Sequence, residues 1–300
     1  MPSWQSYIAH PLLRVMVQRK LAKVSTTAQA RAVFNKVRVA HVSGVNFVHG
    51  QEGGVSGEWA YSHEKTSGIM LYLHGGGYFA CFPAAYRPVT GTFAKHGLNI
   101  FTPAYRLAPE HPFPAAIEDA LAAYRALLAA HSPRRIILAG DSAGGGLALA
   151  LLLAARQEAL PLPAGVVLFS PWTDLAITGA SIKTNARRES LLVGARIQEA
   201  AELYLNGADA QTPLASPLYG DLSGLPPILI QVSDREILLD DSVRVAEKIK
   251  AAQGKVQLQI WPNLPHVWQL AQSFLPEARN ALRQAADFAN QTLASQPPAA

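Results

Sequence analysis

Short apolar runs alternate with amphipathic stretches along most of this chain. Such runs, four to six residues long and bounded by turn-forming residues, predict buried strands. We expect strands at 68–73, 99–103, 135–139, 166–169, 227–232 and 256–261, and helices at 86–96, 115–130, 147–155, 241–252 and 277–293. Regular alternation of this kind predicts a mostly parallel sheet with helices on both faces.

The segment from Val37 to Ser62 has a different pattern. Its β-branched and aromatic residues are interrupted by Gly53-Gly54 and Gly57. This indicates two antiparallel strands at one edge of the sheet. Together with the six runs above, they predict an eight-stranded sheet.

The first part of the chain, from Trp4 to Lys23, carries apolar residues at helical spacing. We expect one or two amphipathic helices here, interrupted near Pro11. Packing on the body of the protein is the favoured role, and binding to a membrane surface is the alternative. Residues 25–27 are suited to cap a second short helix that ends near Phe34.

An interval from about 174 to 213 breaks the alternation. It contains a helical piece at 195–204 but no convincing strand. An insertion at the carboxyl ends of parallel strands is where a lid would lie. With no internal repeat or interdomain linker, residues 1–300 are expected to form a single domain, with a tail at 295–300 that frays.

Composition narrows the class of protein. The 300 residues are 49% hydrophobic and 16% charged, which excludes a disordered chain. The formal charge of +5 forms no dense basic block, so nucleic-acid binding is not expected. Cys81 is the single cysteine and cannot form an intrachain disulfide. With no signal-peptide pattern and no apolar run of about 18 residues, we expect a cytoplasmic protein without a membrane span.

The candidate catalytic nucleophile lies in one pentapeptide, Gly140-Asp141-Ser142-Ala143-Gly144. It lies between an apolar strand and a run of helix formers, which is the context of a nucleophile elbow. The glycines allow strand and helix to approach closely, and the strained turn would expose the hydroxyl of Ser142. The alternative is a glycine-rich turn in which Ser142 only caps the helix. A phosphate-binding loop fits less well, because no Lys-Ser or Lys-Thr follows.

A serine nucleophile needs a base and an acid that orients the base. His266 follows both the elbow and the strand ending at Trp261, so we expect it to be the base rather than an isolated loop histidine. Asp234 directly follows the strand at 227–232 and is the favoured acid. Glu236 is the minority alternative, whereas Asp240 and Asp241 are expected to cap the next helix. The order serine, acid, histidine is that of α/β-hydrolases.

The tetrahedral oxyanion formed during acyl transfer requires N–H donors. His74-Gly75-Gly76-Gly77 follows a strand, and we expect the amides of Gly75, Gly76 and Ala143 to provide the oxyanion hole. A glycine-rich turn without chemistry is the alternative. No metal-ligand pattern accompanies His74. Tyr78 is a candidate substrate-binding residue, with a packing role about equally favoured.

These motifs resemble those of bacterial hormone-sensitive-lipase-type esterases, family IV of the lipolytic enzymes, in the α/β-hydrolase superfamily. The matching pieces lie in the family's order between about 70 and 270: 74–79, 105–110, 112–116, 140–145, 170–172 and 264–266. One departure concerns the acid, which usually lies in an Asp-Pro-Leu turn, whereas this chain has Asp234-Arg235-Glu236.

The resemblance implies an α/β-hydrolase fold and a triad of Ser142, Asp234 and His266. It implies a helical cap made of residues 1–36 and the insertion at 174–213, and hydrolysis of small short-acyl carboxylic esters without a cofactor. A non-catalytic ligand-binding protein of the same fold, an amidase and a lactonase are the alternatives. Whether the chain forms a homodimer is left open.

Overall fold

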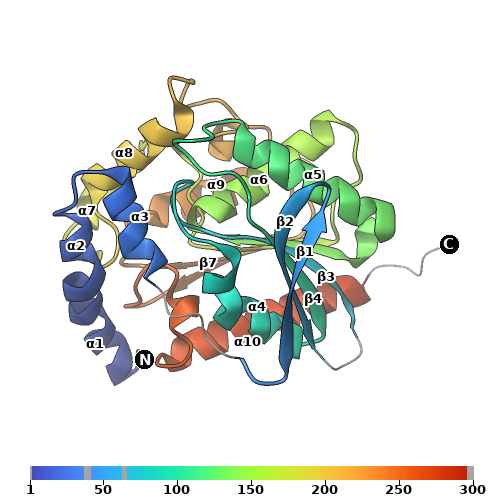
Figure 1. Cartoon of the computed structure of the whole chain (residues 1–300), viewed down its shortest axis with the longest axis horizontal. Coiled ribbons are helices and arrows are strands. Elements are labelled where there is room, and N and C mark those ends of the chain that lie inside the picture. Colours follow the sequence, from blue (N-terminus) through green and yellow to red (C-terminus); the bar gives the residue numbers. More distant parts are fainter. Residues whose placement is uncertain (1, 37–41, 63–65, 296–300) are drawn as a thin grey trace.

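Among the residues that the computed structural model describes (2–36, 42–62 and 66–295), eight strands form one sheet through the middle of the molecule (Figure 1). Their order across the sheet is β1-β2-β4-β3-β5-β6-β7-β8. The pairs β1–β2 and β2–β4 are antiparallel and the other pairs are parallel. The strands are β1 Val45–Glu52, β2 Val55–Ser62, β3 Gly68–Leu73, β4 Leu98–Pro103, β5 Ile136–Asp141, β6 Gly165–Phe169, β7 Ile228–Ser233 and β8 Val256–Trp261.

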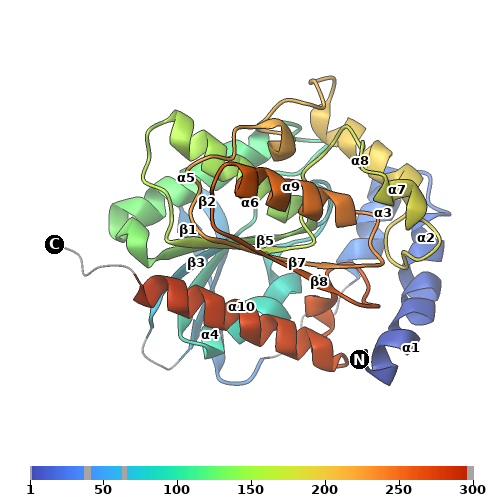
Figure 2. The same ribbon diagram turned by 180° about the vertical axis from the view of Figure 1, so that it is seen from behind.

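Helices cover both faces of this sheet (Figures 1 and 2). Alternate residues of the parallel strands point to opposite faces, so each strand contributes to two separate cores. Leu71, Leu138 and Leu168 pack on one side, whereas Met70 and Val167 pack on the other. The first face is covered by α5 Ala115–Ala130, α6 Ser142–Gln157 and α9 Leu239–Ala251, and the second by α4 Arg87–Lys95 and α10 Pro276–Ala294.

The central strands β3, β5, β6 and β7 are buried along their whole length. That burial explains why their sequences are continuous apolar runs, without an alternation of apolar and polar residues. Strands β1 and β8 lie at the two edges and keep polar residues on their solvent side. The predicted eight-stranded, mostly parallel sheet is therefore confirmed.

A separate group of helices gathers at one end of the sheet, at the left of Figure 1. It combines the first residues of the chain with the insertion after β6. The group contains α1 Trp4–Leu13, the π-helical turn η1 Arg14–Gln18, α2 Arg19–Leu21, α3 Thr27–Asn35, α7 Ser181–Thr184 and α8 Gly194–Leu205. The remaining short 3₁₀ turns are η2 Pro83–Tyr86, η3 Pro133–Arg135, η4 Pro217–Tyr219 and η5 Trp268–Ala271.

Two expectations for the first helices have different outcomes. The predicted break near Pro11 is wrong, because α1 continues through this residue and the irregular turn η1 follows it. A proline lacks the N–H of a normal helix, and a π turn is one way in which a helix accommodates local irregularity. The predicted cap of α3 is confirmed, since Thr26 Oγ1 accepts a hydrogen bond from the amide of Gln29 at 3.2 Å.

The strand predicted to begin at Val37 begins at Val45. Residues 37–41 lie outside the described residues, as does most of the tail that we expected to fray. No helix among the described residues is long and apolar enough to cross a membrane.

Candidate active site

The nucleophile elbow lies at the junction of β5 and α6. Ser142 has a φ of 51°, in the left-handed region that non-glycine residues rarely adopt. A Cβ atom at Gly140 would lie 2.3 Å from the carbonyl oxygen of Gly144, and one at Gly144 would lie 2.0 Å from that of Leu73. The two outer glycines are therefore required by the close contact of the turn with itself and with β3.

His266 lies in the loop after β8, as predicted, and reaches back to the elbow. Its Nε2 atom is 2.9 Å from Oγ of Ser142, and the ring is buried. This distance allows a hydrogen bond through which the imidazole could remove the serine proton. The structure thus brings together the two predicted residues from parts of the chain 124 positions apart.

The acid beside this histidine is Glu236, so the prediction of Asp234 is wrong. Oε2 of Glu236 lies 2.6 Å from Nδ1 of His266, and both side chains are buried. The carboxylate of Asp234 points elsewhere, accepting a hydrogen bond from the amide of Asn263 at 2.8 Å and lying 3.4 Å from Arg188. Asp234 therefore holds the loop that leads to His266, rather than the imidazole itself.

A short turn at the end of β7 explains why the more distant acid reaches the histidine. The amide of Glu236 donates to the carbonyl of Ser233, which turns the chain back on itself. The Oε1 atom of Glu236 then accepts hydrogen bonds from the amide of Ser233 at 2.7 Å and the hydroxyl of Ser170 at 2.8 Å. Because one oxygen is held in this way, the other is left for His266.

Ser170, which the sequence analysis did not single out as a site residue, is the partner that orients the acid. It follows β6 and has a φ of 46°, a second left-handed residue at the same end of the sheet. The available signal was its position in the Ser-Pro-Trp motif directly after a strand end. Nothing in the local sequence indicated which carboxylate it would contact.

The electrostatic surroundings of His266 favour its protonated form. Burial alone would lower the pKa of the imidazole, but the hydrogen bond and charge of Glu236 outweigh it, with help from Glu189 and Asp141. The net result is a pKa raised above 6.5. The same burial raises the pKa of Glu236, and the contact with His266 opposes that rise.

The oxyanion loop after β3 differs from prediction at one glycine. The amide of Gly75 donates to Oδ1 of Asp141 at 2.9 Å, so this N–H is already engaged, and its assignment to the oxyanion hole is wrong. Gly76 and Gly77 line the same cavity as Ser142. The amide of Ala143 belongs to the first turn of α6, where N–H groups have no acceptor within the helix. Gly76, Gly77 and Ala143 are therefore the candidate donors.

Asp141, for which the sequence suggested no role, connects the oxyanion loop to the elbow. Besides the amide of Gly75, its carboxylate accepts hydrogen bonds from the hydroxyls of Tyr72 at 2.9 Å and Tyr86 at 3.3 Å. Burial raises its pKa to about 6, although these donors oppose the rise. A buried carboxylate with three donors is well suited to hold a loop in one position.

His74 is a structural residue of the oxyanion loop. Its ring stacks on Tyr105, with 4.4 Å between the ring centroids, and burial lowers its pKa to about 4. The hydroxyl of Tyr105 donates to the carbonyl of His74 at 2.6 Å. The loop is thus held by side chains from three separate motifs.

A cavity of about 890 Å³ opens onto the triad. Apart from Ser142, His266 and the loop glycines, its walls are mainly apolar and come largely from the helices at the end of the sheet. Residues of this kind include Leu13, Val17, Leu21, Val33, Phe34, Ile197, Ala200 and Leu203. Such a chamber is suited to bury an apolar group attached to a reacting carbonyl.

The structure does not place Tyr78 at this cavity, so its assignment to substrate binding is wrong. The side chain is buried and stacks face to face on Tyr204, with 3.8 Å between the ring centroids. It also contacts the ring of Trp172. Tyr78 is not among the described residues that line the cavity, and it packs the insertion against the oxyanion loop instead.

Comparison with known proteins agrees with the fold described above. A family model of the α/β hydrolase fold matches residues 70–270. The chain is 45% identical over 238 residues to an acetyl-hydrolase from Streptomyces hygroscopicus, covering 79% of this chain and 80% of the relative. It is 38% identical over 240 residues to an esterase from Acinetobacter venetianus, covering 79% of each chain.

Solved structures match nearly the whole chain. The crystal structure of EstE5 soaked with p-nitrophenyl butyrate has a TM-score of 0.93 and 37% identity, covering 98% of this chain and all of the other. An esterase from the bacterial hormone-sensitive lipase family has a TM-score of 0.90 and 38% identity, covering 98% and 99% of the two chains.

Proposed function

The chain belongs to the α/β-hydrolase fold family, in its hormone-sensitive-lipase group, and we propose that it hydrolyses short-acyl carboxylic esters through an acyl-enzyme on Ser142. The observation that carries this proposal is the continuous chain of contacts from Ser142 through His266 to Glu236, with distances of 2.9 and 2.6 Å. A serine hydroxyl in this arrangement has the base and the orienting acid that nucleophilic attack requires.

In the proposed first half-reaction, neutral His266 takes the proton of Ser142 while Oγ attacks the ester carbonyl. The carbonyl oxygen becomes an oxyanion that the amides of Gly76, Gly77 and Ala143 stabilise. His266 then gives its proton to the departing alcohol, and Ser142 keeps the acyl group. In the second half, water attacks the acyl-enzyme with His266 as base, which releases the carboxylic acid and restores the serine.

Glu236 acts in this scheme by holding and stabilising the histidine. Its carboxylate accepts the Nδ1 proton, which leaves the lone pair of Nε2 directed at Ser142. When His266 becomes positively charged in the transition state, the carboxylate charge lies beside it in a buried site. Such an interaction is stronger there than in water.

The preference for short acyl groups is argued from the size and lining of the cavity. A cavity of about 890 Å³ must hold the acyl group, the alcohol and the reacting carbonyl together. We expect acyl groups of about four to eight carbons to react fastest. The ester of butyric acid soaked into crystals of EstE5 belongs to this size class.

We also propose that the helices at the end of the sheet form a cap over the site. Residues 1–36 and the insertion at 174–213 both contribute to the cavity walls, for example through Val17 and Ile197. Arg14 connects the two parts by donating to the carbonyl of Arg187 at 2.7 Å. A cytoplasmic location, and action without a cofactor, remain predictions of the same proposal.

Three other functions use the same fold. An amidase or a lactonase would need the same three residues, and only substrate comparison separates these activities from ester hydrolysis. A non-catalytic ligand-binding protein would have no need of an aligned base and acid, so the geometry of His266 and Glu236 argues against it.

The test is hydrolysis of p-nitrophenyl esters with acyl chains of two to sixteen carbons, compared with the matching anilides. We expect a maximum at about four to eight carbons, little anilide turnover, and loss of activity in Ser142→Ala by roughly 10³-fold or more. Activity that survives in Ser142→Ala would contradict the assignment of the nucleophile. Fastest turnover of the sixteen-carbon ester would contradict the proposed substrate class.

A further inference from the structure

The first helix leaves an apolar face uncovered. Among the described residues, nine large apolar side chains are exposed, and six of them lie within residues 4–16. These six share one side of the helices, since each lies three or four residues from another of the set. They form what we call the outer face of the first helices: Trp4, Tyr7, Ile8, Leu12, Val15 and Met16. The exposed ring of Phe274 extends it, because it packs edge-on against Trp4.

This outer face is not required for packing on the body of the protein. The opposite side of the same helices provides that contact through Ser6, Ala9 and His10, which are buried. Leu13 and Val17 continue the inner side and line the cavity at the triad. The expected packing role of this segment is therefore filled by one side only. On the other side, the ring of Trp4 contacts Phe274, which is itself exposed, and 65% of Trp4 remains accessible to solvent.

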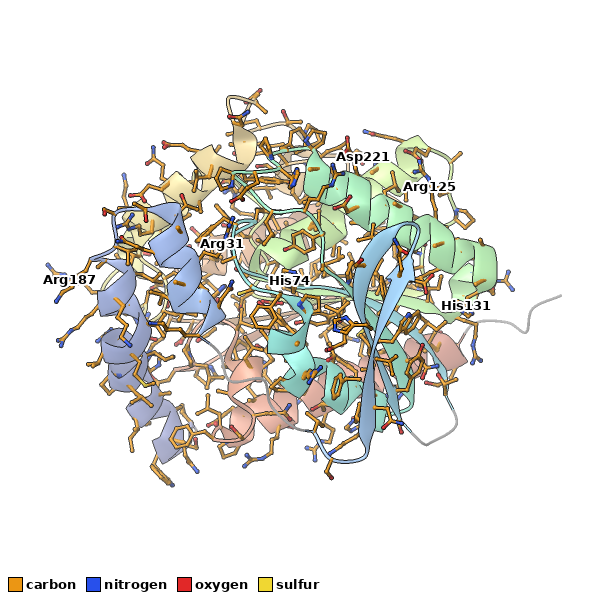
Figure 3. The ribbon with its side chains drawn as sticks, in the orientation of Figure 1. Arg31, His74, Arg125, His131, Arg187 and Asp221 are labelled. Carbon is orange, nitrogen blue, oxygen red and sulfur yellow. The ribbon has the colours of Figure 1, made fainter. Side chains whose placement is uncertain are left out.

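Positive charge accompanies this apolar face. The first 51 residues contain seven lysines and arginines and no acidic residue, whereas the remaining 249 residues contain 19 basic and 21 acidic ones. Three of the seven, Arg19, Lys20 and Lys23, are exposed directly after the apolar stripe. Arg187 of the adjoining insertion is exposed on the same side of the molecule (Figure 3).

We propose that the outer face of the first helices docks on a lipid surface that carries anionic headgroups. A helix with an exposed aromatic and aliphatic face, flanked by lysine and arginine, has the composition that lies in the interface plane of a bilayer. The basic residues would be attracted to the negative headgroups, and Trp4 and Tyr7 are side chains that favour the headgroup level.

Charge also favours lipid over a second copy of this chain. A symmetric dimer through the outer face would bring together two sets of Arg19, Lys20 and Lys23, and the first 51 residues provide no carboxylate to neutralise them. An anionic lipid surface has no such repulsion. Docking would also place the helix that carries Leu13 and Val17, and therefore a wall of the cavity, against the lipid phase.

Vesicle flotation tests this proposal independently of catalysis. We expect the full chain to float with vesicles of phosphatidylcholine containing phosphatidylglycerol, to float less with phosphatidylcholine alone, and to be partly released by about 0.5 M salt. In one variant Trp4→Ser and Leu12→Ser remove apolar anchors, and in another Lys20→Glu and Lys23→Glu reverse the charge. Each should lower the partition coefficient roughly tenfold or more.

The matched control carries Val48→Ser and Ile260→Ser. These residues are 51% and 49% exposed, similar to Leu12 at 49%, but lie on the edge strands β1 and β8. The control should float like the parent chain. All variants should hydrolyse soluble p-nitrophenyl butyrate within about twofold of the parent, which shows that they are folded.

Three outcomes would overturn the proposal. The first is a parent chain that hydrolyses the soluble ester but does not float with anionic vesicles. The second is a control that loses binding as much as the outer-face variants. The third is a dimer in sedimentation that the change at Trp4 and Leu12 dissociates, because a second copy would then cover the face.

Discussion

Oε2 of Glu236 lies 2.6 Å from Nδ1 of His266, in a site where both side chains are almost completely excluded from solvent. The second oxygen of the same carboxylate is held by Ser170 and by the amide of Ser233. The carboxylate that orients the imidazole of His266 is therefore itself held in place by Ser170 and Ser233. This relationship determines how the site should respond to mutation and to pH.

Replacing the acid tests its assignment directly. Glu236→Gln should lower kcat by about 10³- to 10⁴-fold, because a neutral amide neither selects the required tautomer nor stabilises the charged imidazole. Asp234→Asn should lower kcat by less than about tenfold, since Asp234 contacts the amide of Asn263 and not the imidazole. Turnover of p-nitrophenyl butyrate, with circular dichroism to check folding, measures both. Greater loss in Asp234→Asn than in Glu236→Gln would return the acid role to Asp234.

The dependence of activity on pH should report the raised pKa of His266. The base must be neutral, so kcat/KM should fall as the pH decreases through that pKa, with a midpoint above 6.5. Asp141, with a pKa of about 6, titrates in a nearby range, and the Asp141→Asn variant removes its contribution. In Glu236→Gln the residual activity should have its midpoint at lower pH, because the largest influence that raises the pKa is gone. An unchanged midpoint would contradict this account.

Asp141 is predicted to be a positioning residue for the oxyanion loop. Asp141→Ala removes the acceptor of the Gly75 amide and should lower kcat by about 10- to 100-fold with little change in KM, because misplaced donors weaken transition-state binding. Asp141→Asn keeps an oxygen that can accept from Gly75 and Tyr72, and should recover most of the activity. Equal loss in the two variants would show that the negative charge, rather than the hydrogen bond, is what matters.

The left-handed glycine of the oxyanion loop offers a steric test. Gly76 has a φ of 116°, and a Cβ atom there would lie 2.2 Å from the carbonyl oxygen of Ala80. Gly76→Ala should therefore displace the loop and lower kcat by more than about 100-fold. Gly54→Ala is the control, since its φ is 81° but no atom lies within 4 Å of the added Cβ. It should cost about 1 kcal/mol of stability in thermal unfolding and leave kcat unchanged. Normal turnover by Gly76→Ala would exclude this amide from the oxyanion hole.

Much of the fold follows from patterns that are local in sequence. The runs 68–73 and 256–261 and the helix 115–130 coincide with the observed elements, because a buried strand or an amphipathic helix needs only its own residues to be recognised. The nucleophile could be recognised for the same reason, since the glycines around Ser142 satisfy a steric requirement within five residues.

The sequence by itself determined the alternating sheet, the nucleophile at Ser142 and the base at His266. Tertiary structure alone decided between Asp234 and Glu236, because both follow the same strand, and the choice depends on Ser170, which follows the neighbouring strand and, of the two acids, binds only Glu236. The tertiary structure also decided that the amide of Gly75 donates to Asp141 and that the outer face of the first helices stays exposed. A hydrogen bond or a buried face depends on which residue, distant in sequence, lies next to it in the folded chain. The local sequence pattern does not identify that residue.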